Sequence, residues 1–201
     1  TDDTEEVMRS FNDPRIRRRR QEENRGMLAD RNRGLDLAAG DYIAILDDDD
    51  ELLPEALKTV VDEFARLSAA GVGVLFFNCT DYVTGKFTGI GMEEDGYISY
   101  EDHLCGRIGG EFWPVMDRRI IDGMRFDERL WGLESIFWLK LYKKCKFYYI
   151  HTALRIYHRE HGGNVCNFEN QARWRSRITL AHKVFLEEYG NDLKRLCPKR
   201  Y

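Results

Sequence analysis

The sequence predicts an α/β fold in which a mixed, largely parallel sheet is flanked by helices. Three consecutive stretches support this prediction: an apolar run at residues 42–46, an amphipathic segment at residues 54–70, and a second apolar run at residues 72–83. Apolar residues of the middle stretch recur at three- and four-residue steps, as on one face of a helix. Strand, helix and strand in this order imply a crossover connection and parallel strands.

Four consecutive aspartates, at residues 47–50, follow directly after the first apolar run. Adjacent carboxylates repel one another, and a hard divalent cation is the simplest way to hold them together. Oxygen ligands favour Mg²⁺, Mn²⁺ or Ca²⁺ over zinc, and the carboxyl edge of an open α/β sheet is where ligands bind. We therefore expect a Mg²⁺ or Mn²⁺ site here. A solvated acidic turn is the alternative interpretation of the charge run taken alone.

Length and composition limit the classes of protein that this chain can represent. A length of 201 residues fits one domain, or one domain with a helical extension. The net charge of -4 gives no reason to expect a nucleic-acid partner, and no run approaches the roughly 18 apolar residues of a membrane span, so any membrane contact is expected to be peripheral. Five scattered cysteines without a Cys-x-x-Cys pair argue against a zinc ribbon or a disulfide framework and indicate a reducing, cytoplasmic setting.

Residue patterns place the other elements in order along the chain. Helices are expected at residues 5–11, 24–40, 136–145 and 169–189, and further β-structure at residues 112–121 and 147–157. The run of arginines at residues 15–20 is interpreted as an exposed edge, with phosphate contact as the alternative. The glycine-rich residues 84–110 are expected to form a wall of a binding cleft.

Three segments carry a family resemblance. The first contains Asn24-x-Gly26 and Ala29-x-Arg31-Asn32-x-Gly34-Leu35, and the second is Leu46-Asp47-Asp48-Asp49-Asp50, which looks like an Asp-x-Asp site. The third consists of Phe126-Asp127-Glu128 with Glu134 shortly after, followed separately by the motif Arg159-x-His161-Gly162. In this order they resemble the inverting nucleotide-sugar glycosyltransferases of family 2, which have the GT-A fold. The resemblance makes residues 1–165 a partial GT-A core and residues 166–201 a C-terminal helical extension.

The resemblance implies two groups of binding residues. Asp49 would hold a Mg²⁺ or Mn²⁺ ion, and His161 would close over the metal or the diphosphate from the far side. The nucleotide sugar would be held by Arg31, Asp47, Asp48 and Arg159. The family's first β-α-β segment normally precedes a loop similar to residues 1–4, so we expect that part of the nucleotide site to be absent from this chain. A chain without it is expected to bind the donor weakly.

The general base is the residue on which the sequence departs from the family pattern. Similar enzymes often carry Glu-Asp at the start of a helix, with the aspartate as base, whereas this sequence has Glu134-Ser135. Serine cannot take a proton at neutral pH without an activating neighbour, so Glu134 is the expected base. A helix-start carboxylate favoured by the macrodipole is an equally weighted interpretation of Glu134. Sugar rings could stack on Trp131, Trp113 or Tyr97, for which core packing is the alternative.

The resemblance implies transfer of a sugar from a nucleoside diphosphate donor, with a UDP-sugar expected, to a saccharide or lipid-linked hydroxyl acceptor with inversion. Bacterial surface polysaccharide synthesis is the implied setting, at a cytoplasmic location or peripherally on the inner face of the membrane. The alternative is a catalytically inactive nucleotide-sugar-binding homologue or partner subunit. Ser135 and the missing amino-terminal segment both favour this alternative.

Overall fold

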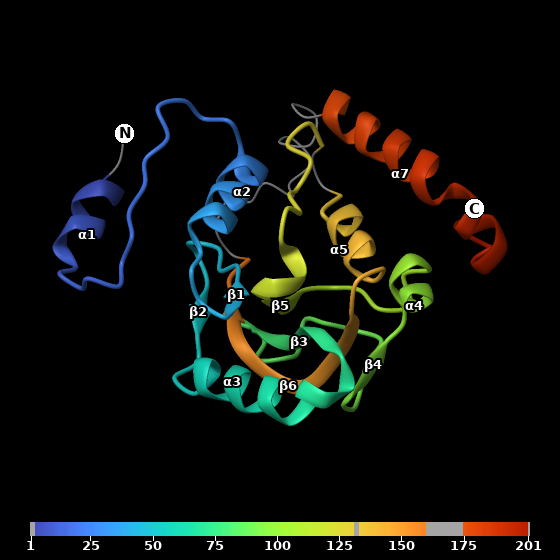
Figure 1. Ribbon diagram of the computed structural model, residues 1–201, viewed down its shortest axis with the longest axis horizontal. Helices are drawn as coiled ribbons and strands as arrows, with labels where there is room; N and C mark the ends of the chain where they lie inside the picture. Colours follow the sequence, from blue (N-terminus) through green and yellow to red (C-terminus); the bar gives the residue numbers. More distant parts are fainter. Residues whose placement is uncertain (1–2, 131–132, 160–174, 201) are drawn as a thin grey trace.

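A mixed sheet forms the centre of the molecule in a computed structural model, which describes residues 3–130, 133–159 and 175–200 (Figure 1). Its strands lie in the order β1-β5-β3-β6-β2, and β4 pairs with β6. The strands are β1 (Tyr42–Ala44), β2 (Glu51–Leu52), β3 (Val72–Asp81), β4 (Gly96–Ile98), β5 (Phe112–Asp117) and β6 (Lys146–Tyr157). The helices are α1 (Thr4–Ser10), α2 (Met27–Leu37), α3 (Ala56–Leu67), α4 (Tyr100–Leu104), α5 (Ser135–Leu141) and α7 (Arg175–Leu196).

The pairing of neighbouring strands refines the predicted sheet. The mixed α/β class is confirmed, and β3 and β6 form a long parallel ladder. The other pairs among the described strands are antiparallel. Strand β5 lies between β1 and β3 and is antiparallel to both, and β2 and β4 are each antiparallel to β6. Strands β1, β3 and β6 therefore run in the same direction without all being neighbours. The expected strand at residues 112–121 ends at Asp117, where the 3-10 helix Arg118–Ile121 begins.

Alternating residues of β3 contribute to two hydrophobic clusters, one on each face of the sheet. Val74 and Phe76 pack with residues of α2 and α5, whereas Leu75 and Phe77 pack with residues of α3. This alternation is the two-residue period of a strand buried on both faces. Figure 1 shows the same arrangement, with α3 covering one face and α2 and α5 lying on the other.

Helix α3 begins after the acidic run, and its burial pattern follows the helical period. It buries Ala56, Val60, Phe64 and Leu67, at three- and four-residue steps. The helical segment ends at Gly71, whose φ of 72° is readily adopted only by a residue without a side chain.

Helix α7 packs on α4 and α5 through a third hydrophobic cluster that includes Leu104, Ile136, Tyr189 and Leu193. A disulfide between Cys105 and Cys197, separated by 92 residues, fixes the end of α7 beside α4. The sequence-based expectation of no disulfide framework is therefore wrong for this pair. It was missed because nothing in the sequence indicates that two cysteines so far apart lie side by side. The helix expected to end at residue 189 continues to Leu196, and the expected boundary at residues 165 and 166 lies outside the described residues. No described helix has both the length and the apolar character needed to cross a membrane.

The disulfide predicts a loss of stability when either of its cysteines is replaced. We expect Cys105→Ser to lower the free energy of unfolding by about 2–4 kcal/mol, because the cross-link restricts the unfolded chain. Urea denaturation followed by circular dichroism measures this loss. Cys145→Ser, which removes a half-buried free thiol, is the control and is expected to cost about 1 kcal/mol or less. Alkylation of both Cys105 and Cys197 in the folded, unreduced protein would contradict the pairing.

Candidate functional site

The acidic turn (residues 47–50) lies across the carboxyl ends of β3 and β6. Strand β1 is on one side of the sheet and β2 on the other, so the segment that joins them must cross this edge. Trp113 in β5 donates a hydrogen bond from Nε1 to the carbonyl oxygen of Ile45 at 3.1 Å, which fixes the segment as it enters the turn. The Asp50 amide donates to the Asp47 carbonyl oxygen at 3.2 Å and closes the turn. The predicted position of the aspartates at the carboxyl edge of the sheet agrees with this geometry.

The four aspartates have different surroundings. The side chain of Asp50 is fully buried, where its Oδ1 accepts a hydrogen bond from the His158 amide at 3.0 Å and its Oδ2 lies 3.3 Å from Arg155 Nε. Burial raises the pKa of the Asp50 carboxyl, against the opposing effects of the His158 amide and the Arg155 charge. Asp47 is half-buried, whereas Asp48 and Asp49 are exposed. Asp48 and Asp49, which form the tip of the turn, are therefore the aspartates open to a ligand.

Arg31 links the acidic turn to the candidate base. It projects from α2, its Nη2 lies 3.1 Å from Asp47 Oδ1, and its Nη1 lies 3.6 Å from Glu134 Oε1. The Arg31 side chain is only 18% exposed, so these ion pairs are partly shielded from water. A guanidinium that is held between two carboxylates still has a planar set of donors suited to a phosphate. The structure thus brings together three of the residues that the sequence singled out.

Glu134 precedes helix α5, and its surroundings bear on the two interpretations of this residue. It occupies the N-cap position, and its side chain makes no capping hydrogen bond, so it does not serve the helix end in that way. Ser135 is the first residue of the helix.

The two other carboxylates considered beside Glu134 are engaged elsewhere. Asp127 accepts from Arg129 Nε at 2.8 Å, and hydrogen bonding from Arg129 lowers the pKa of Asp127 despite partial burial. Glu128 pairs with Arg25 at 2.6 Å. Among these three carboxylates, Glu134 is the one that faces the acidic turn through a shared arginine.

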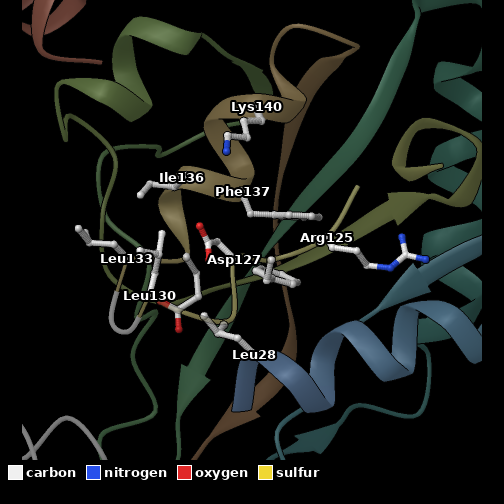
Figure 2. A pocket seen from close by; sticks show the side chains of 10 residues that line it. Leu28, Arg125, Asp127, Leu130, Leu133, Ile136, Phe137 and Lys140 are labelled. Atoms are coloured by element: carbon white, nitrogen blue, oxygen red, sulfur yellow. The ribbon is translucent and has the colours of Figure 1, made fainter. Parts of the chain in front are cut away.

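A small pocket lies beside Glu134, between α2 and α5 (Figure 2). Its volume of about 20 Å³ has room for about one water molecule. Leu28, Asp127, Phe137 and Lys140 are among the residues that line it. A water molecule or a hydroxyl group could enter this space.

Asn32 is a site residue that the sequence analysis quoted but to which it assigned no role. It is buried, and its amide exchanges two hydrogen bonds with the backbone of Phe126, at 2.9 Å to the carbonyl oxygen and 2.8 Å from the amide nitrogen. Its Nδ2 also donates to Glu128 Oε1 at 3.2 Å. Asn32 therefore clamps the loop before Glu134 onto α2. The available signal was a polar residue on the buried face of that helix.

Arg159 lies at the ends of β3 and β6 and contacts Asp81. Its Nε donates to Asp81 Oδ2 at 2.8 Å, while the Thr84 amide and hydroxyl each donate to Asp81 Oδ1 at 2.8 Å. Hydrogen bonds from Thr84, followed by that from Arg159, hold the pKa of Asp81 at about 2. Arg159 is thus at the predicted sheet edge, with its guanidinium paired to Asp81. His161, the other predicted residue of this segment, lies outside the described residues.

The donor atoms at the acidic turn fit a hard cation. Within residues 3–130, 133–159 and 175–200, no group of three or more His, Cys, Asp or Glu side chains is arranged to hold a metal ion. A Mg²⁺ or Mn²⁺ site needs no such cage, because these ions often take one or two carboxylates and complete their shell with water and substrate phosphates. The exposed carboxylates of Asp48 and Asp49 have the required chemistry.

The aromatic candidates for sugar stacking do not support that role. Trp113 is fully buried in the core and is fixed by its bond to Ile45, so the core interpretation is confirmed. Tyr97 lies on β4, which pairs with the amino-terminal half of β6 and hence away from the acidic turn. Trp131 lies outside the described residues.

Solved structures show the class of fold to which this arrangement belongs. The chain superposes on S. aureus TarS 1-349 in complex with UDP-GlcNAc with a TM-score of 0.68 and 18% sequence identity, over 83% of this chain and 49% of the TarS chain. TarS 1-349 in complex with UDP gives a TM-score of 0.62 at 19% identity, over 79% of this chain and 48% of that one. The fold is therefore the GT-A-like glycosyltransferase fold, as the resemblance implied.

Sequence comparisons then identify the family. The model of Glycosyl transferase family 2 matches residues 1–107, and the chain belongs to this family. It is 37% identical over 164 residues to the GalNAc(5)-diNAcBac-PP-undecaprenol beta-1,3-glucosyltransferase of Campylobacter jejuni, covering 78% of this chain and 52% of that protein. It is 28% identical over 144 residues to the succinoglycan biosynthesis protein ExoO of Rhizobium meliloti, covering 64% of this chain and 40% of that protein. The chain thus spans about half or less of the length of these relatives.

The Asn32 clamp predicts a specific effect of a nearly isosteric substitution. Asn32→Asp removes the donor to Phe126 and places a carboxylate beside Glu128, so we expect the free energy of unfolding to fall by about 1–3 kcal/mol. Urea denaturation measures the change. Asn12→Asp, the same substitution at an exposed position, is expected to change stability by no more than about 0.5 kcal/mol. Equal effects of the two substitutions would show that the clamp contributes nothing.

Proposed function

We propose that this chain is the catalytic part of an inverting glycosyltransferase that moves a sugar from a nucleoside diphosphate sugar to a hydroxyl acceptor with the help of Mg²⁺ or Mn²⁺. One observation carries the proposal: Arg31 joins Asp47 of the acidic turn to Glu134, 3.1 Å and 3.6 Å away. This contact supports a cation site for the leaving group and a carboxylate for the acceptor proton at one edge of the sheet. Both groups are required by this reaction.

The acidic turn would serve the leaving group. Asp49 is the proposed metal ligand and His161 the proposed second ligand, with Asp48 and Asp47 near the ribose and diphosphate. A bound divalent cation would supply charge to stabilise the departing diphosphate. Arg31 would direct its guanidinium toward the phosphates or base, and Arg159 would add positive charge at the same edge.

Glu134 would serve the acceptor. Its carboxylate takes the proton of the acceptor hydroxyl while that oxygen forms a bond to the anomeric carbon of the donor sugar. The bond from the anomeric carbon to the diphosphate oxygen breaks in the same step, and the electron pair leaves with the diphosphate. Attack from the face opposite the leaving group gives inversion. General-base assistance of this kind contributes about 10²–10⁴-fold to a rate.

The comparisons support the substrate classes that we propose. TarS 1-349 is solved in complex with UDP-GlcNAc, which supports a UDP-sugar donor. The Campylobacter jejuni relative is described as acting on a glycan linked through a diphosphate to undecaprenol, which supports a lipid-linked saccharide acceptor. We propose a role in bacterial polysaccharide or lipid-linked glycan synthesis, at a cytoplasmic location with peripheral contact to the inner face of the membrane.

A second candidate function has one specific observation in its favour. The helix begins with Ser135, where similar enzymes carry the aspartate base, and Glu134 is already ion-paired to Arg31. A nucleotide-sugar-binding homologue or partner subunit without turnover would tolerate this arrangement. Calorimetric binding of a UDP-sugar without release of UDP in the presence of acceptor would favour this candidate.

The proposed roles of Asp49 and Glu134 predict distinct losses of activity. With the intact protein, we expect Asp49→Ala to abolish Mn²⁺-stimulated release of UDP from UDP-sugars, and Glu134→Gln to lower kcat by about 10²–10⁴-fold. A coupled assay of nucleoside diphosphate release, with Mn²⁺ or with EDTA, measures both. Asp122→Ala, which removes an exposed carboxylate from a distant turn, should leave activity unchanged. Activity in EDTA, or an Asp49→Ala variant as active as the wild type, would overturn the mechanism.

A further inference from the structure

A buried arginine on β6 contacts the last aspartate of the acidic turn. Only 3% of the Arg155 side chain is exposed, and its Nε lies 3.3 Å from Asp50 Oδ2. Its Nη2 donates to Glu111 Oε1 at the start of β5. One guanidinium therefore forms ion pairs with two carboxylates, one just before β2 and the other just before β5. Neither Arg155 nor Glu111 belongs to the segments that carried the family resemblance.

Asp50 transmits this anchoring to the turn. Its carboxylate is fully buried and also accepts from the His158 amide at 3.0 Å, so both of its oxygens face groups of the β6 segment. The turn closes through the Asp50 amide, and the Leu53 amide then donates to the Leu154 carbonyl oxygen at 2.9 Å. The chain is thus fixed to β6 on the carboxyl side of the tip.

The other side of the tip is fixed independently. Ile45 is bonded to Trp113, and Asp47 is paired with Arg31. Asp48 and Asp49 lie between these two anchors, and their direction is set by where the anchors hold the backbone. Removing the Arg155 guanidinium would leave the buried Asp50 carboxylate without a compensating charge, with only the His158 amide as a partner, and a buried charge is costly to keep away from water. The Asp50 side would then move outward and turn the tip with it.

We propose that Arg155 is a positioning residue that sets the direction of Asp48 and Asp49 through Asp50, and that Glu111 joins this support to β5. Arg155 acts through Asp50 and touches neither cation nor sugar. The inference rests on the proposed function in one respect, namely that the tip binds a divalent cation. Outer partners of this kind typically change metal affinity about 10–100-fold when they are removed.

The test compares Arg155→Met, which keeps the length of the side chain but removes its charge, with Arg155→Lys and the wild type. Mn²⁺ affinity is measured by the relaxation of water protons, without turnover, and amide hydrogen exchange is measured over residues 46–53. We expect Arg155→Met to weaken Mn²⁺ binding about 10–100-fold and to speed exchange in this segment. Arg155→Lys should give a smaller loss, because an ammonium can replace the charge but not the two-sided contact.

Arg119→Met is the matched control. Arg119 pairs with Asp117 at the opposite end of β5, and we expect its replacement to change neither Mn²⁺ affinity nor exchange over residues 46–53. If Arg155→Met does not fold, Asp50→Asn keeps the size of the side chain, removes the charge and is expected to give the same two changes. Wild-type Mn²⁺ affinity together with wild-type exchange in a folded Arg155→Met or Asp50→Asn variant would overturn the inference.

Failure of the proposed function gives a different result. A wild-type protein that binds Mn²⁺ but releases no nucleoside diphosphate would overturn the catalytic proposal, and the affinity comparison would still test Arg155. A wild-type protein that binds no Mn²⁺ would overturn the cation site. In that case faster exchange over residues 46–53 in Arg155→Met would support the positioning role, and unchanged exchange would overturn it.

Discussion

The repulsion among four adjacent aspartates is the constraint on which the site depends. Unit charges 4 Å apart interact by about 4 kcal/mol at the effective dielectric constant of a protein surface, so four carboxylates cannot share one turn without compensation. Arg31 from α2 pairs with the first aspartate, and Arg155 from β6 pairs with the last. The two outer carboxylates are therefore neutralised from opposite sides. The middle two, Asp48 and Asp49, remain exposed at the sheet edge.

The Asp50–Arg155 contact explains the position of the turn better than it explains stability. A buried ion pair has a large desolvation cost, and replacing both partners by apolar residues is often neutral or stabilising. Removing one partner instead costs about 3–5 kcal/mol, since it leaves a buried charge uncompensated. The burial that raises the pKa of Asp50 also raises that of Glu111, so Arg155 compensates two desolvated carboxylates at once. Such a contact holds the backbone in one place, which suits a ligand site.

Local residue patterns were sufficient to predict individual strands and helices of this fold. The alternation of β3 and the helical period of α3 follow from apolar spacing, and the acidic run does lie at the carboxyl edge of the sheet, as predicted. The insertion of β5 between β1 and β3 was not predicted, because spacing within a strand carries no information about its neighbour. The Cys105–Cys197 pair was missed for the same reason, since its two residues are 92 positions apart.

For the candidate site, the sequence allowed us to predict which residues take part but not which of them are buried or which contact one another. Nothing in four identical aspartates indicates which one is buried, since that depends on Arg155, which lies more than 100 positions later and reads as one residue of a β-rich stretch. The role of Asn32 likewise could not be predicted, because it depends on a contact with Phe126, which is distant in the sequence. The pairing of Arg31 with both Asp47 and Glu134 is a tertiary contact among residues that were each identified separately.

The balance of charge at this edge supports a role for a divalent cation. Asp47 and Glu134 both pair with the Arg31 guanidinium, and Asp48 and Asp49 are exposed at the tip of the same turn. The Arg159 guanidinium is paired with Asp81. A diphosphate brought to this edge would meet net negative charge, and its binding would be opposed by simple electrostatic repulsion. A divalent cation on Asp49 would reverse that balance for the diphosphate while leaving Arg31 to share its charge between the phosphates and Glu134.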